Sequence, residues 1–161
     1  MGFGSVEPSD VAAAVAAVGE LAAHGMRGVT VDPSTAQISR RFNDRALCPI
    51  YEEAQRLGLI VSTTMSCLLG PYQDDCCPEY VAHVATDFPG LTVFIQHGGW
   101  PYVREALGVA YKQPNVVIVP APAARNRVGV ADERVGEPFC GPRQPQPTAS
   151  RRITARDPAR T

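Results

Sequence analysis

Apolar and polar positions follow two alternating patterns along the first 120 residues. Long segments with apolar side chains every three or four positions predict helices. Short runs of mostly β-branched residues, apolar throughout, predict buried strands. The pattern predicts helices over residues 11–23, 46–57, 78–88 and 101–111, and strands over residues 28–31, 59–63, 91–95 and 116–119.

Capping residues and breakers support these boundaries. Ser9 and Asp10 precede the first helical segment and are good N-caps, while Gly25 and Gly58 stand where helices should end. Regular alternation of helices and strands predicts an α/β fold with a parallel sheet and right-handed crossovers. About four parallel strands are expected within residues 1–120.

The remaining residues, 121–161, have a different composition. They contain eight Arg and six Pro and little periodic apolar content, so we predict a disordered or loosely attached tail. A shifted reading frame in a GC-rich gene would produce such a segment, and resequencing that finds one uninterrupted frame would remove this hypothesis.

Charge and cysteine content exclude several classes of protein. The formal net charge is −1, which argues against a nucleic-acid or membrane-surface role for the whole chain. No apolar run approaches the ~20 residues of a membrane span, and residues 1–10 lack the pattern of a signal peptide. We therefore expect a cytoplasmic protein, in which five cysteines form no disulfide framework.

Residues at the carboxyl ends of the strands are the main candidates for a site, because ligands bind at that edge of parallel sheets. The residues that follow the four predicted strands are Asp32, Thr64, His97 and Pro120. His97 is the sharpest candidate, since a strand-end imidazole can act as general acid or base near neutral pH. The alternative is a histidine that is only hydrogen-bonded at a strand end.

The residues after His97 extend this candidate site. Gly98 and Gly99 let a ligand approach the backbone and lead into a helix N-terminus. Trp100 would stack on a planar substrate or fill a gap between helix and strand. Asp32 would bind a metal or orient a substrate, or merely begin an Asp-Pro turn.

Other polar residues have weaker claims. His24 and His83 fall within helices without a partner at metal-ligand spacing, and Asp74–Asp75 is expected to be solvated loop charge. Cys76–Cys77 with Cys67 lacks the spacing of a zinc site. No phosphate-loop or nucleophile-elbow motif is present, so phosphate binding at Gly98–Gly99 is the weakest hypothesis.

Four segments together resemble the amidohydrolase-related family of metal-dependent hydrolases and decarboxylases, of the aminocarboxymuconate-semialdehyde decarboxylase type. Residues 25–33 are similar to G-x-x-G-V-x-x-x-P, and residues 49–59 to P-x-Y-E-x-A-x-x-L-G-L. Residues 88–99 are similar to F-P-x-L-x-x-x-x-x-H-G-G, and residues 113–116 to x-P-N-V. The resemblance covers roughly residues 8–120.

This resemblance implies a TIM-type barrel with a divalent metal, zinc above all, held by a His-x-His, a mid-chain His and a late Asp. His97 corresponds to a further strand-end histidine of the family, whereas the mid-chain ligand position holds Thr64. The His-x-His would lie before Met1 and the late Asp beyond the tail. We therefore expect a truncated member that binds no metal by itself.

Two functions follow from the resemblance. In its intact form the protein would hydrolyse or decarboxylate a small carboxylated or cyclic substrate, with His97 catalytic and with Asp32, Thr64, Gly98, Gly99 and Trp100 near the substrate. The alternative is a non-catalytic remnant or interaction module. With either function, open sheet edges would favour a homo-oligomer.

Overall fold

The structure is a computed structural model that describes residues 2–66 and 72–120. Its strands are β1 (Phe3–Val6), β2 (Gly28–Val31), β3 (Ile60–Thr63), β4 (Val93–Ile95) and β5 (Val116–Ile118). Its α-helices are α1 (Val11–Ala23), α2 (Cys48–Arg56), α3 (Glu79–Asp87) and α4 (Val103–Lys112). Three short 3-10 helices complete the order: η1 (Arg45–Leu47), η2 (Gln73–Cys76) and η3 (Gln96–Gly99).

The five strands form one parallel sheet in the order β1-β2-β3-β4-β5. Val29 of β2, Val61 of β3 and Val93 of β4 are level with one another. The predicted α/β class and the four predicted strands are confirmed. The strand count was one too low, because β1 is also present and pairs with β2 from Phe3 opposite Gly28 to Val6 opposite Val31.

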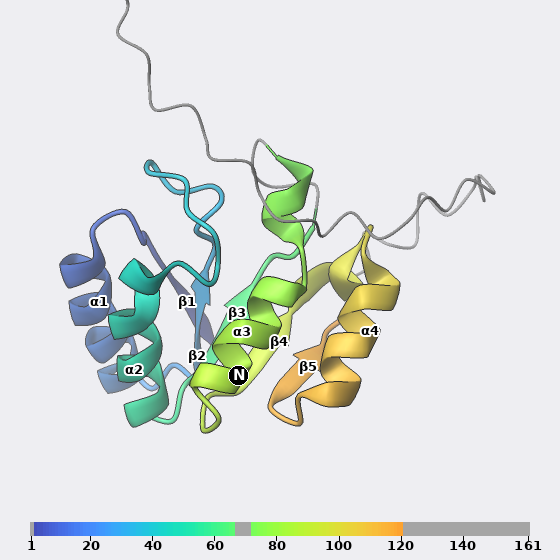
Figure 1. Ribbon diagram of the computed structural model, residues 1–161. Helices are drawn as coiled ribbons and strands as arrows, with labels where there is room; N and C mark the ends of the chain where they lie inside the picture. The colour runs from blue at the N-terminus through green and yellow to red at the C-terminus, as the bar shows by residue number, and fades with distance from the viewer. Residues whose placement is uncertain (1, 67–71, 121–161) are drawn as a thin grey trace, which may run out of the picture.

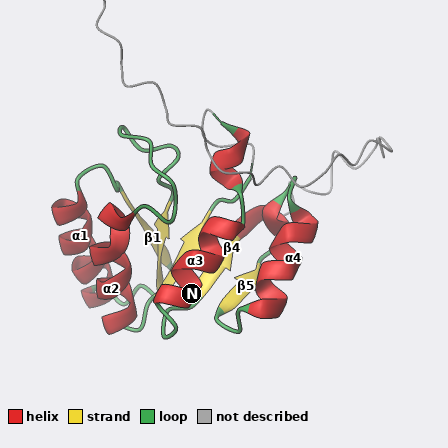
Figure 2. Ribbon diagram, viewed as in Figure 1, coloured by secondary structure: helices red, strands yellow, loops and turns green. Residues whose placement is uncertain are grey.

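In the described residues all four α-helices cover one face of the sheet (Figure 1). Figure 2 shows the same layers by secondary structure. Val29, Val61 and Val93 are fully buried beneath the helices, at 0% exposure. Because side chains alternate along a strand, Phe94 and Ile60 lie on the opposite face, which we call the open face, and both remain partly exposed.

An aromatic cluster fixes α2 against the rest of the core. Tyr51 is fully buried, and its ring lies 5.2 Å from that of Phe42 and 5.7 Å from that of Phe88, centroid to centroid. The Tyr51 hydroxyl donates to the carbonyl oxygen of Phe42 at 2.6 Å. This hydrogen bond attaches the loop before α2 to the helix layer, on the side where the strands have their carboxyl ends.

Helix ends agree closely with the sequence pattern. Asp10 caps α1, since its Oδ1 accepts from the backbone N–H of Ala13 at 3.0 Å. Gly25, with φ of 76°, follows the last turn of α1 as expected. None of the helices in the described part of the chain is long and apolar enough to cross a bilayer. The predicted tail, residues 121–161, lies outside the described residues.

Candidate site at the carboxyl edge of the sheet

The strand-end residues gather along one edge of the sheet. Asp32 follows β2, Thr64 follows β3, and His97 lies in η3 directly after β4. Since the strands are parallel and Thr63 is level with Ile95, these residues share the carboxyl edge. The sequence prediction of their location is confirmed; their roles remain predictions.

Asp32 and Thr64 bind each other. Oδ1 of Asp32 accepts from the backbone N–H of Thr64 at 2.6 Å, and Oδ2 accepts from its hydroxyl at 3.2 Å. The carboxylate thus satisfies the first backbone donor beyond β3, where the sheet ladder ends. Both oxygens of Asp32 already have a partner, which leaves only their remaining lone pairs for a substrate or an ion.

His97 is held in a left-handed backbone conformation that side chains rarely adopt. Its φ is 57°, and Gly98 and Gly99 follow with φ of 66° and 71°. The N–H of Gly98 donates to the carbonyl oxygen of Val119 at 3.1 Å, and the N–H of Val119 donates to that of Ile95 at 2.8 Å. The turn is therefore anchored to Val119, the residue that follows β5. This anchor fixes the backbone position of His97. Non-glycine residues in this conformation are enriched at functional sites.

Among the described residues, Nδ1 of His97 stands out as a polar atom of the candidate site. Nδ1 is buried, and no group within the described residues forms a hydrogen bond with it. Buried polar atoms are normally paired, so this nitrogen is a candidate for binding or proton transfer. The alternative interpretation was a histidine that is only hydrogen-bonded at a strand end. It does not apply to Nδ1, because this atom forms no hydrogen bond within the described residues.

Sequence reasoning missed Gln96 and Ser62. Nε2 of Gln96 donates to Oγ of Ser62 on β3 at 2.7 Å, across two neighbouring strands. Ser62 is 1% exposed, although it lies on the open face between Thr30 and Phe94 in register. A polar residue within the apolar run of β3 and a second one directly before His97 were the available signals.

The two glycines and the tryptophan have different surroundings. The N–H of Gly98 is already bonded to Val119, so it is not free for a phosphate. A side chain at Gly99 would place its Cβ 2.6 Å from Cβ of Ala106, so the turn packs closely on α4. Trp100 is 46% exposed, which disagrees with the gap-filling interpretation.

The described residues do not fit a metal centre. No three His, Cys, Asp or Glu side chains among them come together as metal ligands. Asp32 is engaged by Thr64, and a threonine occupies the position where the family resemblance implies a histidine. A resident divalent ion would need ligands from outside the described part of the chain.

One expectation about the segment before α3 was wrong, and a disulfide bond there was not predicted. Asp75 is 6% exposed instead of solvated, and burial followed by the charge of Asp74 raises its pKa, against a smaller lowering by Arg41. Cys77 is disulfide-bonded, which the spacing of the cysteines did not predict. Cysteine counting cannot detect a single disulfide within an odd number of cysteines.

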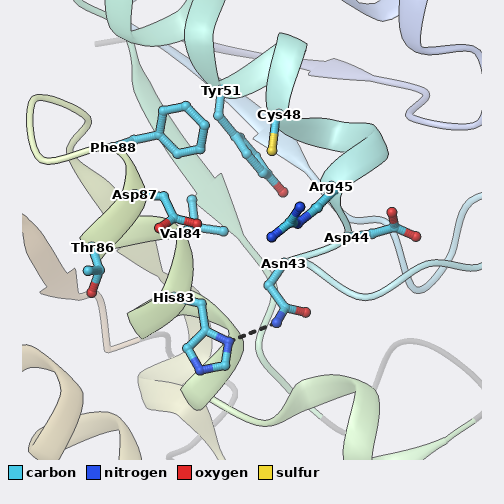
Figure 3. A pocket seen from close by; sticks show the side chains of 10 residues that line it. All are labelled: Asn43, Asp44, Arg45, Cys48, Tyr51, His83, Val84, Thr86, Asp87 and Phe88. Atoms are coloured by element: carbon cyan, nitrogen blue, oxygen red, sulfur yellow. Dashed lines mark hydrogen bonds between the residues drawn. The ribbon is translucent and has the colours of Figure 1, made fainter.

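A pocket of about 310 Å³ lies between η1, α2 and α3, in the helix layer (Figure 3). Asn43 and His83 both line it, and Nδ2 of Asn43 donates to Nδ1 of His83 at 2.8 Å. Burial, then the charges of Glu52 and Asp87, raise the pKa of the Cys48 thiol, so this thiol is not an activated nucleophile. None of the strand-end residues lines the pocket, whose walls are Asn43, Asp44, Arg45, Cys48, Tyr51, His83, Val84, Thr86, Asp87 and Phe88.

Parallel strands, helices on one face and polar residues at the carboxyl edge define part of a (β/α) barrel. The amidohydrolase family model matches residues 1–152, and the chain belongs to that family. No curated protein matches the chain.

Solved structures support the fold. The uncharacterized TIM-barrel protein Bb4693 from Bordetella bronchiseptica is 32% identical, with a TM-score of 0.71 over 77% of this chain and 44% of its own. The amidohydrolase map2389c from Mycobacterium avium subsp. paratuberculosis K-10 is 20% identical, with a TM-score of 0.52 over 73% of this chain and 41% of its own. An amidohydrolase II, target LpR24, is 18% identical, with a TM-score of 0.53 over 76% of this chain and 50% of its own. The chain thus matches at most half the length of these structures.

Proposed function

We propose that this chain supplies the His97 edge of an amidohydrolase-type barrel that hydrolyses or decarboxylates a small carboxylated or cyclic substrate. The observation that supports the proposal is the buried Nδ1 of His97, which lacks a partner among the described residues and sits in a turn fixed to the end of β5. A strand-end group held in this way is preorganised for chemistry at the carboxyl edge.

His97 would move a proton in either reaction. In hydrolysis Nδ1 would accept the proton of the attacking water and return it to the leaving group. In decarboxylation it would deliver a proton to the carbon that loses carbon dioxide. Trp100, which is partly exposed beside the turn, would cover a planar substrate.

The amidohydrolase family is generally metal-dependent, and a divalent ion such as zinc would activate water or polarise the substrate. Because the described residues do not fit such an ion, no step of the proposal passes through a metal. A cytoplasmic location also stays a prediction. The disulfide at Cys77 is unusual for a reducing compartment.

The test compares wild type with His97→Asn on a panel of small lactones and aromatic carboxylates, with and without added Zn²⁺ or Mn²⁺. Lactone opening and carbon dioxide release are the readouts. Loss of about 10²-fold or more on His97→Asn supports the role of His97. His83→Asn is the matched control, because His83 is an exposed histidine of α3 and its loss should change nothing.

A second candidate function is a non-catalytic remnant. The engagement of Asp32 by Thr64, where a metal site would be expected, favours it. Wild type that stays inactive on the whole panel, with and without metal, would support this function against the first. NMR of the three histidine rings adds an independent readout: an Nδ1 of His97 that is inaccessible to titration would argue against proton transfer.

A further inference from the structure

The side-chain amide of Gln96 lies over the open face of the sheet, next to the turn that carries His97. Gln96 follows β4 directly and is partly exposed. Its Nε2 donates at 2.7 Å to Oγ of Ser62, which stands level with Phe94 on the open face. In a closed barrel this face is the interior, and ligands bind where the strands of its wall end. Gln96 and the carboxyl-edge site therefore face the same space.

Ser62 holds the amide of Gln96 in one place. Ser62 is 1% exposed and lies in the middle of the sheet, so its hydroxyl oxygen is a fixed acceptor. A primary amide has two N–H donors and one carbonyl acceptor. The bond to Ser62 uses one of the donors. Within the described residues the second N–H and Oε1 of Gln96 form no hydrogen bond, so a ligand can use both.

The charges at this edge favour a neutral ligand group over an anion. The residues that directly follow the five strands include two acids and no Lys or Arg: Glu7, Asp32, Thr64, Gln96 and Val119. The loop after β2 contains Arg40 and Arg41, but each is already close to a carboxylate, Asp44 at 3.4 Å and Asp74 at 3.6 Å. A carboxylate beside Gln96 would therefore gain little from the described cations, whereas a neutral carbonyl needs only a hydrogen-bond donor.

We propose that Gln96 determines substrate specificity by recognising the neutral carbonyl group of a small lactone or lactam, and that Ser62 is its positioning residue. This inference rests on the proposed function, because it concerns the substrate on which His97 would act. The free N–H of Gln96 donates to the carbonyl oxygen of the ring. The N–H of a lactam can donate in turn to Oε1. Phe94, which is partly exposed on the same face, contacts the apolar part of the ring.

Gln96→Glu separates recognition from support of the fold. The Ser62 hydroxyl can donate to the new carboxylate, so the contact between the two side chains is kept. The free N–H is lost, and a negative charge faces the substrate carbonyl instead. With δ-valerolactone as substrate we expect KM to rise about tenfold or more while kcat changes by less than about twofold. A fall in kcat without a rise in KM overturns the proposal.

The role of Ser62 is tested by coupling. Ser62→Ala should raise KM less than Gln96→Glu does, because the amide stays present but is no longer held in place. Added to Gln96→Ala, it should raise KM no further, since no amide remains to be positioned. Independent, additive effects of the two substitutions would mean that Ser62 does not act through Gln96.

Gln113→Glu is the matched control. Nε2 of Gln113 donates to Oγ1 of Thr86 at 2.9 Å, so the same substitution changes the same kind of bond, but between α3 and the end of α4. Gln113 is also partly exposed, and it lies away from the carboxyl edge. We expect KM to stay at the wild-type value, and a rise equal to that of Gln96→Glu overturns the proposal.

NMR gives a readout that does not depend on turnover. The side-chain amide signals of Gln96, assigned by their absence in Gln96→Glu, should shift when 2-piperidone, a lactam, is added to the full chain. Cyclohexanecarboxylate, a ring of the same size with a carboxylate, should shift them much less, and an equal shift overturns the preference for a neutral group. If 2-piperidone leaves the signals unmoved while δ-valerolactone is still opened, this inference fails and the proposed function stands. If 2-piperidone shifts the signals of a chain that opens no lactone, recognition by Gln96 is supported and the proposed function fails.

Discussion

The aromatic rings of Phe3 on β1 and Phe94 on β4 lie only 6.0 Å apart, centroid to centroid. Two strands separate β1 from β4, and neighbouring strands are about 4.8 Å apart, so a flat sheet would place these rings about 14 Å from each other. The sheet therefore curls toward its open face. This curvature is what the wall of a closed barrel requires.

Gly28 makes this contact possible, because the ring of Phe3 lies directly over it. A Cβ at residue 28 would collide with that ring and would lie 2.7 Å from the carbonyl oxygen of Ile60. We expect Gly28→Ala to lower the free energy of unfolding by about 1–3 kcal/mol through overpacking. Urea denaturation measures the change.

Gly19→Ala is the control for this substitution. Gly19 lies inside α1, and the nearest atom to an added Cβ is Oε1 of Glu53 at 3.9 Å. Alanine there should be neutral or stabilise by up to about 1 kcal/mol, since it is the better helix former. Equal effects at both positions would contradict the proposed steric role of Gly28.

The bond between Asp32 and Thr64 gives a second prediction. Asp32→Ala should cost about 1–3 kcal/mol, because it leaves the N–H of Thr64 without its acceptor at a partly buried position. Thr64→Val removes only the longer hydroxyl bond and should cost less, while Thr64→Ser should be nearly neutral. Hydrogen exchange of the Thr64 amide should become faster in Asp32→Ala alone; unchanged exchange there would refute the assignment.

The fold could be predicted from the sequence where local signals agreed with tertiary packing. Three of the predicted strands correspond to β2, β3 and β4, since β-branched and apolar runs favour a strand that is mostly buried. The fourth corresponds to β5. β1 was missed because its sequence, Phe-Gly-Ser-Val, contains a glycine and a serine and forms a strand only through pairing with β2.

The location of the site was predictable, but its contacts were not. Parallel topology alone places Asp32, Thr64 and His97 at one edge. The bonds between Asp32 and Thr64 and from Gln96 to Ser62 join residues about 30 positions apart, and the sequence analysis did not predict which residues of neighbouring strands stand level. The burial of Asp75 likewise comes from tertiary packing around η2.

The buried Tyr51 hydroxyl predicts a loss of stability in alkali. Burial, then the charges of Cys48 and Asp44, raise the pKa of Tyr51 well above its ordinary value of 10.0. The folded state therefore holds this proton more tightly than the unfolded state, so stability is full below pH 10 and falls as the pH rises above it. Urea denaturation at neutral pH and above pH 10 measures the slope.

Tyr51→Phe should flatten this alkaline loss. It should also cost about 1–3 kcal/mol at neutral pH, because the carbonyl oxygen of Phe42 loses its donor. The pKa of Cys48 is raised from 9.0, chiefly by burial, so Cys48→Ser should remove a separate part of the loss that begins at lower pH. An unchanged slope above pH 10 in Tyr51→Phe would show that another group titrates.

The turn that carries His97 gives the last prediction. Gly98 and Gly99 both have left-handed backbone angles, so alanine at either costs about 1–2 kcal/mol of strain. At Gly99 the added Cβ also lies 2.6 Å from Cβ of Ala106, whereas at Gly98 it meets nothing within 4 Å. Gly99→Ala should therefore destabilise by a further ~1–3 kcal/mol and displace the turn, which shifts the NMR signals of the His97 ring. Gly98→Ala should leave those signals nearly unchanged, and similar shifts in both variants would mean that packing on α4 does not position the imidazole.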